Sequence, residues 1–138
     1  MPAPILNDRD LEFMLYELFN VETLTERERF QDHNRETFDA AIATSKTIAE
    51  KFFIPIRQKV DGNEPTFDGE KVHMLPEIKP AIDAVVNSGL SAPTTDYDFG
   101  GMQLPNIVAN VVSANLSAAA STTLGYISLT HANCNLIE

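Results

Sequence analysis

The sequence predicts an all-α protein folded as one helical domain over residues 1–138. Apolar residues recur at helical spacing in several segments, and no segment has the long alternation of apolar and polar residues that is typical of a strand. A chain of this length normally forms one domain and buries enough surface to fold without a disulfide or a metal. We expect the first helices within 8–60, and a glycine elbow followed by a long uncharged helix within 76–131.

The first helix is expected from about residue 8 to residue 19. Asn7 or Asp8 can cap its N-terminus, because either side chain can accept hydrogen bonds from the backbone N–H groups of the first turn. Its apolar face repeats at i, i+3, i+4 and i+7 and consists of Leu11, Met14, Leu15 and Leu18.

Two further helices are expected before residue 56. Thr25 followed by Glu28 fits the capping-box pattern and predicts a short helix within Thr23–Asp32. Thr37–Phe53 carries a long amphipathic pattern that Pro55 should kink or end. The apolar stripe of the Thr37–Phe53 helix consists of Phe38, Ala41, Ile42, Ser45, Ile48, Ala49 and Phe52.

A polar stretch rich in glycine and proline separates these helices from the next one. The segment Phe67–Glu70, which contains Asp-Gly, is expected to form a tight turn. A helix is then predicted from about 77 to 88, with Pro76 at its start and Gly89 suited to cap its C-terminus. Its packed residues are expected to be Ile78, Ile82, Val85 and Val86.

Residues 99–137 contain no Asp, Glu, Lys or Arg. Within this run Leu104–Leu129 is expected to be helical, with Pro105 in the first turn and small residues over Ser117–Ser121. One side of the helix carries Ile107, Val108, Val111, Val112 and Leu116.

A helix without charge on any face must be surrounded by lipid, by helices of the same domain, or by another domain or subunit. Asn110, Asn115 and several serines would each need a partner inside hydrocarbon. We therefore expect protein around this helix rather than a membrane span.

The charge balance disfavours nucleic acid as a partner. The chain has 20 acidic and 10 basic side chains, a formal charge of -10, which repels phosphate backbones and anionic lipid headgroups. Cys134 is the only cysteine, so no intrachain disulfide can form, and the first residues lack the basic and then apolar run of a secretory signal. These features predict a cytoplasmic protein.

The candidate metal ligands are few and scattered. Of the three histidines, His33, His73 and His131, only His131 lies at helical spacing from another soft ligand, Cys134. Two ligands make a poor zinc site, so we expect no metal. Without a nearby base or cation to activate its thiol, Cys134 is interpreted as a small buried hydrophobe.

The pair Gly100-Gly101 predicts a tight turn and a close backbone approach just before the uncharged helix. A phosphate cradle is the alternative, but the basic residue and the preceding strand of a P-loop are missing. Nearby Asp96 and Asp98 could do acid–base work, although solvated carboxylates are routine in loops. We therefore interpret the glycine pair as a structural elbow.

The stretch from Tyr97 to Pro105, Tyr-Asp-Phe-Gly-Gly-Met-Gln-Leu-Pro, resembles a signature of the acyl-CoA dehydrogenase family, in which Gly-Gly and Leu-Pro open a long helix. Phe53–Ile56 is similar to the apolar-Pro-apolar end of the family's long early helix, and Leu129–His131 is similar to the Leu-Thr-His of a long-chain subgroup. The resemblance spans roughly residues 8–138. Three positions depart from it: Leu90 replaces Trp, Gln103 replaces Gly, and Ala132 replaces Gly.

The resemblance implies an FAD enzyme that removes hydrogens from the α and β carbons of an acyl-CoA and passes electrons to an acceptor. Such enzymes are homo-oligomers with an N-terminal helical domain, a β domain and a C-terminal helical domain. Glu138 ends this chain as though a longer protein had been cut, before the flavin site and the catalytic glutamate. No catalytic residue is therefore expected here, and Gly125, Tyr126 and Leu129 are expected to line the acyl pocket.

Two other classes remain open. The chain could be a helical interaction or oligomerisation module, whose uncharged segment binds a partner protein or a second copy. An independent catalytic domain is poorly supported, because no Ser/His/Asp, Cys/His or metal constellation is visible. Both leading hypotheses predict that the isolated chain exposes apolar surface and self-associates, and that Lys in place of Leu116 or Leu124 disrupts the assembly or the fold.

Overall fold

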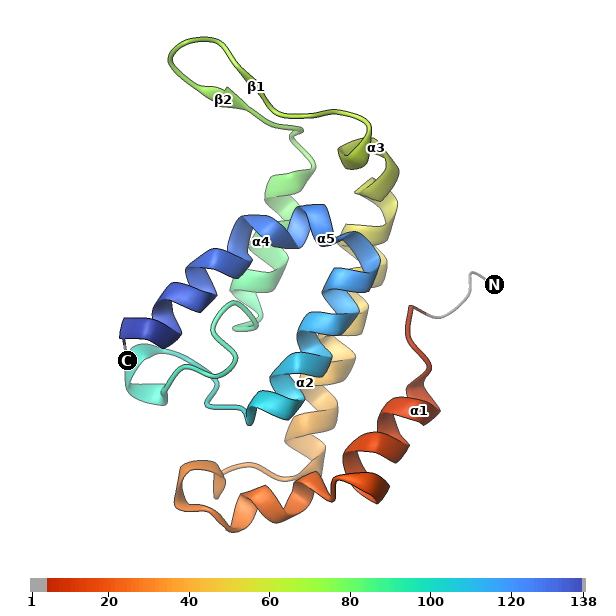
Figure 1. Cartoon of the computed structure of the whole chain (residues 1–138), viewed down its shortest axis with the longest axis vertical. Coiled ribbons are helices and arrows are strands. Elements are labelled where there is room, and N and C mark those ends of the chain that lie inside the picture. The colour runs from red at the N-terminus through yellow and green to blue at the C-terminus, as the bar shows by residue number, and fades with distance from the viewer. Residues whose placement is uncertain (1–4, 138) are drawn as a thin grey trace.

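A computed structural model describes residues 5–137, with side chains up to Cys134. Figure 1 shows a mostly helical molecule with a small hairpin at one end, so the predicted all-α class is confirmed. The elements are α1 (Asp8–Glu12), α2 (Arg35–Ile48), α3 (Arg57–Asp61), β1 (Thr66–Phe67), β2 (Val72–His73), α4 (Ile78–Asn87) and α5 (Asn106–Ile137). Between them lie π-helical turns at Phe13–Leu18 and Ala49–Phe53, and 3-10 turns at Val21–Glu26, Glu28–Phe30, Ile54–Ile56 and Tyr97–Phe99.

The first helical run joins α1 to the π-helical turn Phe13–Leu18, as expected. Its cap is Asn7, whose side chain accepts hydrogen bonds from two backbone N–H groups. The predicted apolar face is wrong in part: Leu15 is buried, but Met14 and Leu18 are exposed. The wider π turn advances each residue by a smaller angle, so positions at α-helical spacing no longer share one face.

The short second helix predicted within Thr23–Asp32 is wrong. Two 3-10 turns, Val21–Glu26 and Glu28–Phe30, meet at an extended Arg27. The Thr25 hydroxyl donates to the carbonyl of Glu22 and caps nothing. With Val21 as the buried residue of these turns, little apolar burial favours a continuous α-helix over local side-chain hydrogen bonds.

Helix α2 begins at a capping box. The side chain of Asn34 accepts from the Thr37 N–H, and the Thr37 hydroxyl accepts from the Asn34 N–H. The predicted stripe packs as expected at Phe38 but not at Phe52, which is exposed while Phe53 is buried. The π-helical turn Ala49–Phe53 inserts an extra residue into one turn and so shifts the inward-facing position by one.

Pro55 does not end the helix. It lies in the 3-10 turn Ile54–Ile56, and helical structure continues into α3 as far as Asp61. A proline removes one backbone donor and crowds the preceding turn. The change from π to 3-10 hydrogen bonding accommodates both effects. The helical run from Arg35 to Asp61 therefore changes its hydrogen-bond pattern near Pro55 and does not end there.

Between α3 and α4 the chain forms the hairpin β1–β2, which projects from the helices in Figure 1. The predicted tight turn is confirmed: the Asp68 carboxylate accepts from the N–H groups of Glu70 and Lys71, each at 2.8 Å. Helix α4 matches its predicted range and ends at Gly89, whose φ of 81° is left-handed. Of its expected packing residues Val86 is wrong, because it is exposed.

Helix α5 contacts α2, α3 and α4 and supplies much of the core. The expected single helix Leu104–Leu129 is wrong in one respect, because Ala120 has φ -161° and ψ 89°, which are not helical angles. The chain bends there, and Figure 1 shows the second half of α5 running at a steep angle to the first. The core clusters around Phe38, Phe53, Val85, Val108, Val112 and Leu116.

Candidate functional site

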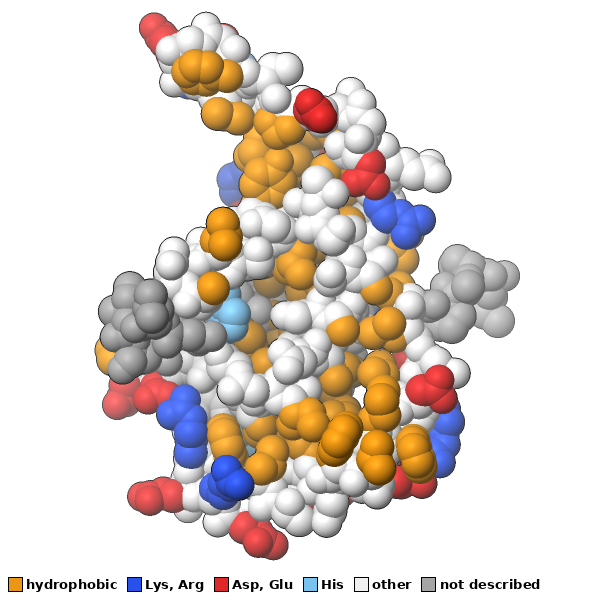
Figure 2. All heavy atoms as spheres, in the orientation of Figure 1, with side chains coloured by type: hydrophobic (Ala, Val, Ile, Leu, Met, Phe, Trp, Pro, Cys, Tyr) orange, Lys and Arg blue, Asp and Glu red, His pale blue; other side chains and the backbone are white. Residues whose placement is uncertain are grey.

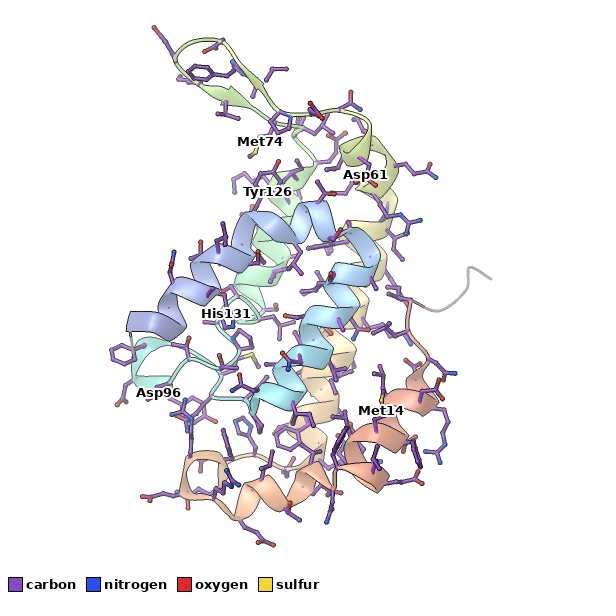
Figure 3. The ribbon with its side chains drawn as sticks, viewed as in Figure 1. Met14, Asp61, Met74, Asp96, Tyr126 and His131 are labelled. Atoms are coloured by element: carbon purple, nitrogen blue, oxygen red, sulfur yellow. The ribbon has the colours of Figure 1, made fainter. Side chains whose placement is uncertain are left out.

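The three residues predicted to line an acyl pocket lie together on the second half of α5. Tyr126 is 40% exposed and Leu129 75% exposed, and a Cβ built on Gly125 would meet no heavy atom within 4 Å. Figure 3 labels Tyr126 on this half of the helix. Their spacing of i, i+1 and i+4 keeps them on one side of the helix. They therefore form an open surface.

A small cavity of about 70 Å³ lies on the opposite side of the same half-helix, inside the bend. Leu116 from before the bend and Leu124 and Ile127 from after it provide apolar walls, and the loop after α4 closes the remaining side. The full lining is Leu90, Ser91, Pro93, Ser113, Leu116, Leu124, Ile127, Ser128 and His131.

This cavity combines alkyl side chains with serine hydroxyls and one imidazole. It is smaller than the pockets of about 300–1,000 Å³ that enclose a typical ligand. Its lining contains no carboxylate and no lysine or arginine. Sequence reasoning missed His131 and Ser128 as cavity residues because only the bend at Ala120 brings them back toward Leu90.

The three histidines lie in separate places. His33 contacts the carbonyl of Gln103, His73 pairs with Asp68, and His131 lines the bend cavity. Among the described residues, no group of three or more His, Cys, Asp or Glu side chains is placed to hold a metal ion. Cys134 is half-buried, which corrects the expected burial, and its neighbours Ala132 and Asn133 are exposed.

The glycine pair forms the expected elbow. The N–H of Gly100 donates to Tyr97 and that of Gly101 to Asp96, at 2.9 and 3.0 Å, so neither is directed at a phosphate. A Cβ on Gly101 would lie 2.0 Å from the carbonyl oxygen of Thr95, a distance that no side chain tolerates. Gly101 is therefore required by the close approach of two backbone segments.

The aspartates of the elbow have different surroundings. Asp98 is exposed, as expected, but Asp96 is half-buried and forms an ion pair with Arg29, which corrects its interpretation as a solvated carboxylate. The same guanidinium donates to the carbonyl of Thr94 at 3.1 Å. Asp96 thus has a structural partner in the segment between α1 and α2.

A larger groove of about 350 Å³ separates the first helical run from α2. Its rim carries ion pairs from Lys46 to Asp8 and from Arg35 to Glu12, so these charges already have partners. Burial, and a 2.5 Å hydrogen bond that the Tyr16 hydroxyl donates to Asp39, raise the pKa of Tyr16. The apolar floor consists of Leu11, Leu15, Ile42 and Ala43.

The face formed by α5 carries almost no charge, whereas acidic and basic side chains alternate around the margin of the molecule in Figure 2. Within the described residues one helix, Asn106–Cys134, is long and apolar enough to cross a membrane, with a mean hydropathy of 1.3 and 44% of its most apolar window buried. A core helix passes the same test of length and composition.

The sequence matches no protein-family model, and no curated protein sequence matches it.

Proposed function

We propose that this chain is the N-terminal helical domain of a flavin-dependent acyl-CoA dehydrogenase, in which the second half of α5 forms part of the wall around the acyl chain. The observation that carries the proposal is the backbone of Gln103. Its φ is 50°, a left-handed conformation that glycine adopts without cost and that other residues resist. The family signature has glycine at the position of Gln103. The left-handed backbone found at this position is therefore the conformation that the glycine of the signature would favour.

Gly101 supports the same alignment. The 2.0 Å approach of its would-be Cβ to Thr95 gives the second glycine of the pair a strict steric reason. Leu104 and Pro105 are both buried and open α5, in agreement with a Leu-Pro that begins a long helix. Within Tyr97–Pro105, the left-handed backbone at position 103, the close approach at Gly101 and the buried Leu104-Pro105 therefore all agree with the signature.

The chemistry assigned to this chain is limited to shaping the pocket. The exposed surface of Gly125, Tyr126 and Leu129 is apolar enough to contact an alkyl chain. Residues 99–137 contain no carboxylate that could remove a substrate proton. The bend cavity beside this surface does not fit a flavin, because it measures about 70 Å³ and the sequence has no Lys or Arg after Lys79 to meet a pyrophosphate. No reaction step is therefore assigned to this chain.

The proposal extends to the context of the domain. The flavin, the acyl-CoA and the electron acceptor would be bound by a longer polypeptide, acting as a homo-oligomer in the cytoplasm. The uncharged face of α5 would then be covered by other parts of that polypeptide.

The test compares the 138-residue chain with the protein encoded by its complete reading frame. Visible absorbance reports bound flavin, and oxidation of acyl-CoAs of several chain lengths with an artificial electron acceptor reports activity. The expected result is a yellow, active complete protein and a colourless, inactive 138-residue chain. A complete protein that is colourless and inactive would refute the dehydrogenase assignment, and a yellow, active 138-residue chain would show that the active site is misplaced.

A helical interaction module is the second candidate, and the first helical run favours it. There Phe13, Met14, Leu18 and Phe19 are all exposed, although they lie close together along the chain. Such a cluster is typical of a protein-binding surface. A reading frame that ends at Glu138, together with a stable complex formed by the isolated chain, would favour this candidate over the enzyme domain.

A further inference from the structure

The segment between α1 and α2 touches the glycine elbow through two residues that are far from it in sequence. Arg29 and His33 both contact Gln103, which lies just before α5. Gln103 is one of two described residues other than glycine with a positive φ, the other being Asn20. A strained conformation persists only where the surroundings hold it.

The hydrogen bonds approach Gln103 from both ends of the residue. Its side-chain Nε2 donates to the backbone carbonyl of Arg29 at 2.6 Å, and its own carbonyl lies 3.1 Å from Nε2 of His33. A carbonyl can only accept, so we assign the ring proton to Nε2 of His33. Backbone and side chain of Gln103 are thus both tied to residues 29–33.

His33 is itself held in place. Its Nδ1 lies 3.3 Å from the hydroxyl of Thr37, which belongs to the capping box of α2, and its ring lies 5.6 Å from that of Phe38. The Tyr97 hydroxyl is 3.1 Å from Nε2. The imidazole therefore connects the N-terminus of α2 to Gln103, shortly before α5 begins at Asn106.

A second tie runs beside the first. The guanidinium of Arg29 pairs with Asp96 and donates to the carbonyl of Thr94. Both residues lie in the loop that leads into the elbow. Figure 3 places Asp96 next to the segment that precedes α2. The elbow is fixed at Asp96 and again at Gln103.

We infer that Arg29 and His33 form a brace that holds Gln103 in its left-handed conformation and thereby sets where α5 begins. Without the brace, Gln103 would relax toward the ordinary right-handed or extended regions. The N–H groups of Gln103 and Leu104 would then lose their bonds to the carbonyls of Thr95 and Pro93. The first turn of α5 would move with them.

The brace is accessible to solvent, so it can open without unfolding the core. An open cleft of about 320 Å³ lies between it and the elbow, lined in part by Asp32, His33, Tyr97 and Met102. Burial and the nearby Asp32 carboxylate raise the pKa of Tyr97, so this hydroxyl stays neutral beside the imidazole. Local opening of this kind is read most directly from amide hydrogen exchange.

The test is a double-mutant cycle between His33→Ala and Gln103→Gly in the 138-residue chain, read by the exchange rates of the backbone amides at positions 103 and 104. His33→Ala should raise both rates by about three- to tenfold, the equivalent of one hydrogen bond. In the Gln103→Gly background, the same change should have an effect of less than about twofold, because glycine holds a positive φ without a brace. His73→Ala, which removes an imidazole from the exposed hairpin, is the matched control and should change neither rate.

Equal effects of His33→Ala in both backgrounds would overturn the inference, because they would mean that His33 acts only by packing against Phe38. No effect in either background would overturn it as well. If His33→Ala alone fails to fold, recovery of the fold in the double variant supports the brace, and failure of both contradicts it. Exchange rates carry the result, so it does not depend on the flavoenzyme assignment.

Discussion

The side-chain amide of Asn115 in α5 donates a hydrogen bond to the hydroxyl of Ser45 in α2, with 3.0 Å between Nδ2 and Oγ. Both side chains are buried, and the Ser45 hydroxyl donates in turn to the carbonyl of Ile42 at 2.7 Å. Buried polar groups need such partners. This pair explains how an uncharged helix tolerates an amide in the protein interior, and it fixes the register of α5 against α2.

The first prediction follows from this pair. Asn115→Ala should lower the free energy of unfolding by about 1–3 kcal/mol, because it removes a buried partner of Ser45 and leaves a small cavity. Urea unfolding followed by circular dichroism measures the change. Asn110→Ala, at an exposed position of the same helix, is the control and should shift stability by less than about 0.5 kcal/mol. Equal effects at the two positions would contradict the role of the buried pair.

The second prediction compares glycines with different surroundings. Gly101→Ala should cost more than about 3 kcal/mol, because its Cβ would collide with backbone that cannot rotate away. Gly100→Ala meets no atom within 4 Å, but its φ of 79° should still cost about 1–2 kcal/mol. Gly125→Ala, in open space inside α5, should stabilise by about 0.5–1 kcal/mol. Thermal unfolding gives the order, and a Gly101→Ala variant as stable as Gly125→Ala would refute the close approach.

Features that depend on local hydrogen bonding could be predicted from the sequence. Asn7 caps its helix and Gly89 ends α4, because each depends on backbone groups close to it in sequence. The pair Gly100-Gly101 likewise forms the predicted elbow, with backbone hydrogen bonds to Tyr97 and Asp96. The capping box assigned to Thr25 was wrong, since 3-10 turns offered its hydroxyl a closer acceptor.

Features that depend on tertiary packing could not be predicted. The bend at Ala120 lies in a run of small residues with no glycine or proline to mark it. It alone decides which residues of the second half of α5 meet the bend cavity, so His131 was not recognised there. The π-helical turn Ala49–Phe53 likewise cannot be recognised from the pattern of apolar residues. Because of this turn, Phe53 lies in the core and Phe52, which was expected there, is exposed.

The third prediction concerns pH at the tip of the hairpin. Hydrogen bonds from His73 and from the N–H groups of Lys71 and Glu70 lower the pKa of Asp68 to about 2. A carboxyl whose pKa is lower in the folded state stabilises the fold fully above its unfolded pKa of about 4 and loses that contribution as pH falls toward 2. The hairpin turn should therefore loosen between about pH 4 and pH 2. NMR shifts of the Phe67 and Val72 amides would follow it.

Asp68→Asn is the control for this pH effect. The amide keeps an acceptor oxygen for the backbone N–H groups but carries no titrating charge. Its hairpin should show no transition between about pH 4 and pH 2. A transition of the same size in both proteins would assign the effect to another carboxyl.

The last prediction separates the fold from the exposed surface of α5. Leu116 is 2% exposed and lies in the core, so Leu116→Lys should unfold the chain by burying an unpaired charge. Leu129 is 75% exposed, so Leu129→Lys should keep the helical circular dichroism spectrum and change stability by less than about 0.5 kcal/mol.

If the apolar surface of α5 drives self-association of the isolated chain, light scattering should show a larger monomer fraction for Leu129→Lys than for the unchanged chain. Leu18→Lys, on the exposed side of the first helical run, is the comparison: loss of association in that variant alone would place the contact there and favour an interaction module. A strictly monomeric unchanged chain at high concentration would refute self-association through either surface.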